Sequence, residues 1–117
     1  FTLVEMAHAF HLKEKQPCYG LFFSFHSKNF FFTSDTRFTP ETLMPYYKKA
    51  DIIFHDCETR TPKSPIHSHY TELLTLPDDI KKKMWLYHYN IGELPNAAKG
   101  GFQGFIQKHQ SFDLAKI

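Results

Sequence analysis

The feature that most constrains this chain is an aromatic strand that ends abruptly at an aspartate. Residues 29–38 read NFFFTSDTRF, so three phenylalanines run directly into a Ser-Asp-Thr turn. An apolar run of this kind is typical of a buried strand in an α/β sheet, and ligands collect outside the carboxyl ends of such strands. We therefore expect Asp35 to be a metal ligand or a catalytic acid. The competing interpretation is that Asp35 only starts the turn that leads to Thr39 and Pro40.

Two later segments repeat this arrangement. Residues 52–56 (IIFHD) and 84–88 (MWLYH) are short apolar runs that end in aspartate or histidine, and four of the eight histidines lie at such strand ends or in the polar loop after the first of these segments. Neutral imidazole and carboxylate groups together suit zinc, iron or manganese, and an open position on such a site activates water. His55 is interpreted as a packed strand-end histidine rather than a ligand.

Composition limits the class of protein. A chain of 117 residues with 42% hydrophobic and 17% aromatic content can build the core of one domain. Its 14 basic and 12 acidic side chains give a net charge of +2, too small to indicate a nucleic-acid or membrane partner. The chain lacks the run of roughly 20 apolar residues that a bilayer span needs, so we expect a soluble, cytoplasmic protein. Cys18 and Cys57 lack metal-site spacing and are expected to be reduced thiols.

Apolar runs near the start predict an antiparallel hairpin. Residues 3–6 and 19–25 are expected strands, and a tight turn at residues 26–29 leads into the aromatic strand. The polar stretch at residues 11–17 is expected to be a surface loop.

The rest of the chain alternates helix and strand signals. Thr39 can cap a helix that begins at Pro40, and Pro45 is expected to kink or restart it. The other expected elements are helices at residues 69–74 and 77–83, strands at 52–54 and 84–87, and an edge strand formed by residues 105–108 together with Phe112. Hairpin strands followed by alternating helices and strands predict a mixed sheet covered by helices, an α/β or α+β fold.

The order of these motifs resembles the metallo-β-lactamase-fold metal-dependent hydrolases, on the ribonuclease Z and cyclic-nucleotide phosphodiesterase side. SDT at residues 34–36 is similar to the strand-terminal GDT of that family, with Ser34 in place of glycine. MWLYHYN at residues 84–90 is similar to its last ligand histidine. IFHDCET (53–59) and IHSHYTEL (66–73) resemble the ribonuclease Z-like pair of a histidine-acid strand end followed by an HST-type histidine.

The resemblance implies a centre of two divalent metal ions, with zinc preferred and iron or manganese as alternatives. Asp35 would bridge the two ions, and His88 would be a ligand. A third ligand is expected at His8, with His11 as the competing candidate. An aspartate at the bridging position, where many zinc β-lactamases have cysteine, argues against antibiotic hydrolysis.

The resemblance also implies residues that act on the substrate. His67 or His69 would protonate a leaving group or stabilise phosphate charge, and Asp56 would orient that histidine through a hydrogen bond. The expected activity is metal-dependent hydrolysis of a phosphodiester, in a phosphate-ester small molecule or a nucleotide.

One motif of that family is absent. No HxHxDH sequence occurs in the chain, and the resemblance covers only the second half of the family's domain. We therefore expect residues 1–117 to be the C-terminal half of an αβ/βα sandwich, cut from a longer protein. It would pair with the missing half or with another copy of itself. The alternative is a non-catalytic, self-associating half-domain, and a nucleic-acid-binding module is a weaker third possibility.

Overall fold

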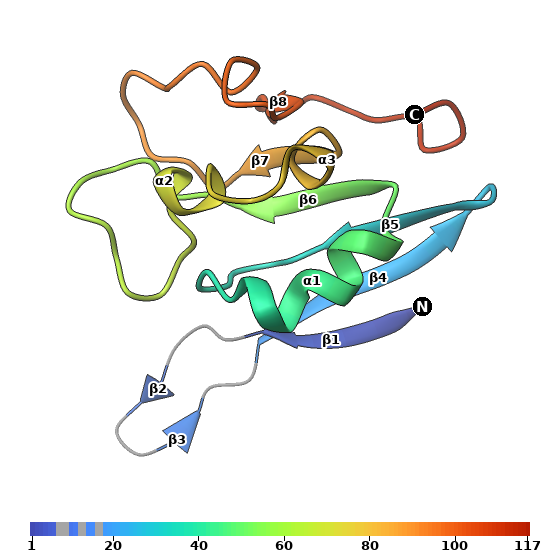
Figure 1. Ribbon diagram of the computed structural model, residues 1–117, viewed down its shortest axis with the longest axis horizontal. Coiled ribbons are helices and arrows are strands. Elements are labelled where there is room, and N and C mark those ends of the chain that lie inside the picture. Colours follow the sequence, from blue (N-terminus) through green and yellow to red (C-terminus); the bar gives the residue numbers. More distant parts are fainter. Residues whose placement is uncertain (7–9, 12–13, 16–17) are drawn as a thin grey trace.

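The computed structural model describes residues 1–6, 10–11, 14–15 and 18–117. Within these residues the chain forms a six-stranded mixed sheet with the strand order β1-β4-β5-β6-β7-β8 (Figure 1). A separate two-stranded ribbon joins β2 (Phe10–His11) to β3 (Glu14–Lys15). The mixed α/β fold predicted from the sequence is confirmed, whereas the stretch predicted as a surface loop contains part of this ribbon.

The first half of the sheet is antiparallel. β1 (Thr2–Met6) pairs with β4 (Cys18–Phe25), which pairs in turn with β5 (Lys28–Phe32). Both His26 and Ser27 in the connecting turn have positive φ, 50° and 63°. Positive φ at two successive positions is the geometry of a primed hairpin turn, which matches the twist of the strands that it joins.

The second half of the sheet is parallel. β6 (Ile52–Asp56) lies beside β5, β7 (Met84–Tyr87) lies beside β6, and β8 (Gly104–Phe105) forms the edge. The predicted edge strand at residues 105–108 is therefore wrong in length, because the strand ends at Phe105. Phe112 belongs to no strand and instead places its ring 5.3 Å from Phe54 and 5.1 Å from Trp85.

All three helices of the described chain cover one face of the sheet. In Figure 1, α1 (Pro40–Lys49) lies in front of β4 and β5, α3 (Asp78–Lys81) lies in front of β7, and α2 (Tyr70–Leu73) lies near the carboxyl ends of β6 and β7. α1 begins at Pro40 as predicted, and it continues through Pro45. None of the described helices is long and apolar enough to cross a bilayer.

The hydrophobic core fills the space between the helices and the sheet. The Tyr46 and Tyr47 rings of α1 lie 5.5 and 6.1 Å from the ring of Phe31 in β5. Leu73 and Met84 close the core under the shorter helices, with no exposed surface. Side chains alternate along a strand, so the neighbours of these core residues point to the opposite face.

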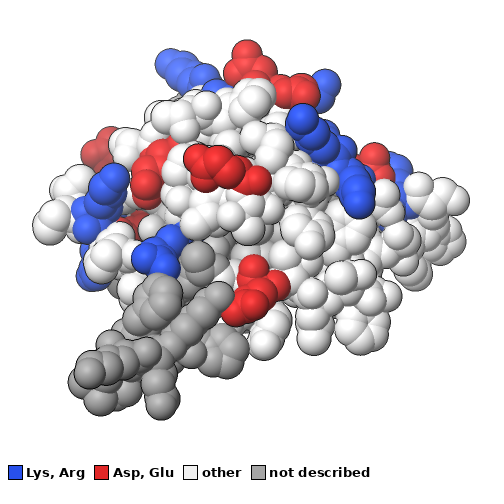
Figure 2. Space-filling model, turned by 60° about the horizontal axis from the view of Figure 1, so that its bottom comes forward, with Lys and Arg blue, Asp and Glu red and all other residues white. Residues whose placement is uncertain are grey.

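The opposite face of the sheet is rich in aromatic side chains and partly open. Leu3, Tyr19, Phe25 and Phe32, which we call the open aromatic face, are each between 40% and 60% exposed. Figure 2 shows the charged side chains of another side of the molecule, where acidic and basic groups are interspersed rather than separated by sign. A surface of this kind gives no support to the weaker nucleic-acid-binding alternative.

Candidate metal centre

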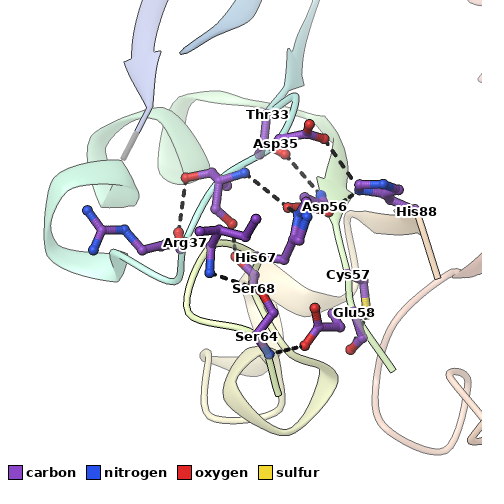
Figure 3. Close-up of polar contacts among 12 residues, drawn as sticks. Thr33, Asp35, Arg37, Asp56, Cys57, Glu58, Ser64, His67, Ser68 and His88 are labelled. Atoms are coloured by element: carbon purple, nitrogen blue, oxygen red, sulfur yellow. Dashed lines mark hydrogen bonds and ion pairs between the residues drawn. The ribbon is translucent and has the colours of Figure 1, made fainter. Parts of the chain in front are cut away.

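Two carboxylates and two imidazoles meet at the carboxyl ends of the central strands. Asp35 follows β5, Asp56 is the last residue of β6, His88 directly follows β7, and His67 lies in the loop between β6 and α2 (Figure 3). One potential ligand atom from each of the four residues lies within 4.8 Å of the other three. The sequence-based expectation that Asp35 and His88 converge at neighbouring strand ends is confirmed.

Asp56 is the centre of this cluster. Its side chain has no exposed surface, and its two carboxylate oxygens contact different histidines. Nδ1 of His67 lies 2.8 Å from Oδ2, and Nδ1 of His88 lies 3.0 Å from Oδ1. Nδ1 of His88 also lies 3.3 Å from Oδ1 of Asp35. The His88 ring therefore faces two carboxylates, one buried and one half-exposed.

Backbone groups hold Asp56 between the ends of β5 and β6. The Thr36 N–H donates to Oδ2 of Asp56 at 3.0 Å, and the Asp56 N–H donates to the Thr33 hydroxyl at 3.0 Å. A buried carboxylate is stable only when such donors compensate for the water it has lost. Thr33 and Thr36 lie on either side of Ser34 and Asp35, so the Ser-Asp-Thr turn supports the cluster as well as contributing to it.

Two residues of the cluster region adopt the left-handed backbone conformation. Ser34 has φ 59° and His88 has φ 68°. Glycine occupies this region without steric cost, whereas other residues need support from their surroundings. The first position of the SDT turn is thus one that suits glycine, which accounts for the glycine of the related GDT motif.

The loop that carries His67 is fixed by hydrogen bonds at both ends. The Ser68 hydroxyl donates to the Thr36 carbonyl at 2.9 Å, and the buried Glu58 carboxylate accepts from the Ser64 N–H. Glu58 also pairs through its backbone with Ser68 and Tyr70. Sequence reasoning did not select Glu58, although it lies two residues after Asp56 in the motif that carried the resemblance.

His69 has a different position from His67. Its Nδ1 accepts from the Thr71 N–H at 3.2 Å, which makes His69 the cap of α2, and its Nε2 donates to the Arg60 carbonyl at 2.8 Å. Both ring nitrogens are therefore engaged within the loop. Of the two histidines left open by the sequence, His67 is the one that the structure brings to Asp56.

The predicted third ligand cannot be placed. His8 lies outside the described residues, and of His11 the structure describes only its backbone position in β2. Sequence reasoning assigned Asp56 to one of His67 and His69 and missed its contact with His88. That contact depends on β6 and β7 being adjacent and in register, with Asp56 opposite Tyr87.

The donor set of the cluster fits a divalent cation. Two aspartates and two histidines each offer a ligand atom within a few ångströms of the others, and one of the aspartates is fully buried. Carboxylate oxygens and imidazole nitrogens are ligands that zinc, iron and manganese accept. Hydrogen bonds between imidazole and carboxylate also fix ring orientation in metal sites.

Burial changes the acid–base behaviour of the residues around the cluster. Burial lowers the pKa of His55 to about 4, so this imidazole is neutral at pH 7, and the predicted packed position of His55 is confirmed. Burial raises the pKa of the Cys57 thiol, and the charges of Asp56 and Glu58 raise it further. Cys57 is thus a protonated thiol, and Cys18 is also free.

The fold defines the structural class of the protein. It is similar to the metallo-β-lactamase fold protein YhfI from Bacillus subtilis, with a TM-score of 0.62 and 18% identity over 89% of this chain and 44% of that chain. The chain therefore has a metallo-β-lactamase-type fold.

Sequence comparison shows the family within this class. The family model described as Anti-Pycsar protein Apyc1 matches residues 1–112, and the chain belongs to this family. It is 40% identical to Anti-Pycsar protein Apyc1 from Paenibacillus harenae over 83 residues, which are 68% of this chain and 31% of that relative. Identity to the protein of the same name from Paenibacillus sp. strain J14 is 29% over 113 residues, 95% of this chain and 44% of the relative. The chain thus spans less than half the length of these relatives.

Proposed function

We propose that this chain provides the C-terminal half of the catalytic domain in a metal-dependent phosphodiester hydrolase that acts on a nucleotide. The observation that carries the proposal is the convergence of Asp35, Asp56, His67 and His88 at three strand ends. The metallo-β-lactamase-type fold supports it, as does the resemblance of the SDT, HDCET and IHSH motifs to ribonuclease Z and cyclic-nucleotide phosphodiesterases.

Asp35 and His88 would hold the metal in this proposal, with His8 as a further ligand. When bound, the ions, zinc in the first instance, would supply a Lewis acid that stabilises negative charge on phosphate oxygens. The half-exposed side chains of Asp35 and His88 are accessible to a ligand, unlike Asp56. Asp56 would orient the two histidine rings through its contacts with their Nδ1 atoms.

His67 would exchange a proton with the substrate. Because Asp56 is an acceptor, it favours the tautomer of His67 that carries hydrogen on Nδ1. Nε2 of His67 is then the atom that would deliver a proton to the leaving oxygen. His69 is a weaker candidate because its ring caps α2 and contacts Arg60.

The active protein would also need a second structural layer. The open aromatic face formed by Leu3, Tyr19, Phe25 and Phe32 is a surface that proteins of this size normally cover. The chain also spans only 31% to 44% of the length of its relatives. We propose that the remainder of the domain, or a second copy of the chain, packs on this face and adds further metal ligands.

Metal binding and hydrolysis are tested with the same set of variants. Zinc affinity is measured by calorimetry for the protein and for Asp35→Ala, His88→Ala and, as a control, His109→Ala, which changes an exposed histidine outside the cluster. The first two changes should weaken zinc binding at least tenfold, because each removes a direct ligand, and the control should not.

Hydrolysis is measured with bis(p-nitrophenyl) phosphate and with the ribonucleoside cyclic monophosphates, on protein that includes the second layer proposed above. His67→Ala should abolish turnover while zinc binding persists, since His67 is assigned to the substrate. Protein that binds no zinc, with unchanged stability after Asp35→Ala and His88→Ala, would instead favour the second candidate, a non-catalytic half-domain that only associates.

A further inference from the structure

On the side of β6 that faces β5, strand pairing covers Ile52, Ile53 and Phe54 and does not reach Asp56. The last backbone bond of the described chain between the β5 segment and β6 runs from the Thr33 N–H to the Phe54 carbonyl, at 3.0 Å. Beyond it the two strands separate, which makes room for the turn that carries Asp35. The Asp56 N–H therefore donates to a side chain, the Thr33 hydroxyl, instead of a β5 carbonyl.

The carbonyl of Asp56 is bound by the side chain of His55. Nδ1 of His55 lies 2.8 Å from this oxygen, and because a carbonyl only accepts, Nδ1 carries the hydrogen. Nε2 of the neutral ring is then an acceptor, and the Tyr47 hydroxyl donates to it at 2.7 Å. Tyr47 and His55 both have no exposed surface.

The pair formed by Tyr47 and His55 links α1 to the cluster through the backbone carbonyl of Asp56. Tyr47 belongs to α1, and His55 and Asp56 are successive residues of β6, so their side chains point to opposite faces of the sheet. The His55 ring lies among the core residues under α1, while the Asp56 carboxylate contacts His67 and His88 on the other side.

We propose that Tyr47 and His55 are positioning residues for the metal centre. They hold the Asp56 peptide group at a point where β5 no longer pairs with β6. This keeps the Asp56 carboxylate between the imidazoles of His67 and His88. The inference rests on the metal centre proposed above, and it adds two residues that touch neither metal nor substrate. Without this pair, the Asp56 carbonyl would be buried without its donor and the carboxylate would lose its fixed orientation.

Two neighbouring tyrosines provide a matched test. Tyr47→Phe removes only the hydroxyl that binds His55. Tyr46→Phe removes the hydroxyl of the preceding residue of α1, for which the structure shows no hydrogen bond to His55. Zinc affinity should fall about tenfold in Tyr47→Phe, at the lower end of the range for residues that act through a ligand, and stay within about twofold in Tyr46→Phe. Equal affinities in both variants would overturn the proposal.

Substitutions of His55 separate positioning from packing. The amide nitrogen of asparagine can replace Nδ1 as donor to the Asp56 carbonyl, whereas phenylalanine fills the space without a donor. His55→Asn keeps this donor but loses the bond to Tyr47, so it should lose about tenfold in zinc affinity, as Tyr47→Phe does, while His55→Phe loses both bonds and should lose clearly more. The reverse order, or equal losses in both, would mean that the ring only fills the core.

A readout without metal distinguishes failure of this inference from failure of the proposed function. In metal-free protein, ¹⁵N spectra should show His67 and His88 with hydrogen on Nδ1, and Tyr47→Phe should produce mixed tautomers while Tyr46→Phe does not. If the protein binds no zinc but these spectra change as expected, the metal proposal fails and the positioning role stands. Unchanged spectra in Tyr47→Phe would overturn the positioning role.

Discussion

The buried His55 makes the stability of the fold sensitive to acid. Burial lowers the pKa of this residue from 6.5 to about 4 in the folded protein. Between these values the unfolded chain binds a proton that the folded protein does not, so the free energy of unfolding falls as pH falls from about 6.5 to 4. At about 1.4 kcal/mol for each pH unit, the loss from His55 alone is about 3 kcal/mol, a large part of the stability of a small domain.

Urea unfolding between pH 7 and pH 4, with a chelator present, measures this contribution. His55→Asn provides the reference, because asparagine does not titrate and retains a donor for the Asp56 carbonyl. The wild-type protein should lose about 3 kcal/mol more than the variant over this range, and the two curves should become parallel above pH 7. Parallel curves throughout would refute the argument, since they would mean that His55 takes up its proton equally well in the folded protein.

Three further changes test other parts of the structure by denaturant unfolding. Ser34→Gly should raise the free energy of unfolding by about 1 kcal/mol, because φ 59° suits glycine, and a decrease would show that the Ser34 hydroxyl matters more than the backbone. Leu86→Ala removes a fully buried side chain of β7 and should cost about 2–5 kcal/mol, so a loss below 1 kcal/mol would contradict the observed core. Lys63→Ala breaks an ion pair with Glu72 whose lysine side chain is 58% exposed, and it should change stability by less than about 0.5 kcal/mol.

The sequence predicted the strand ends of the site because two independent signals coincide there. Apolar runs identify buried parallel strands, and a polar residue at the end of such a run lies at the ligand-binding edge of the sheet. Asp35 and His88 both carry these signals, and the structure brings them to 3.3 Å. Their assignment as metal ligands stays a prediction.

The choice between His67 and His69 was beyond local sequence patterns. In an extended segment these residues point the same way, so alternation alone treats them equally. Only the start of α2 distinguishes them, because His69 occupies the cap position, where its ring accepts from the Thr71 N–H. Histidine is not among the residues preferred at that position, so the capping role leaves little trace in the sequence.

The role of Tyr47 also depends on tertiary structure. Tyr47 faces the sheet, and its bond to His55 follows from the packing of α1 against the sheet. The sequence prediction for Phe112 is wrong for the same reason: it places this residue in an edge strand, whereas its ring packs against Phe54 and Trp85. Sequence periodicity predicts which way a residue points within an element, whereas contacts between elements depend on how they are arranged.

The alternation of His55 and Asp56 along β6 makes the length of this segment critical. Adding or deleting a single residue between Asp51 and His55 would turn the acid under α1 and the imidazole toward the opposite side, because each step along a strand reverses the direction of the side chain. Homologous chains should therefore accept changes of length at residues 59–66 or 89–100 but keep this short stretch free of insertions and deletions.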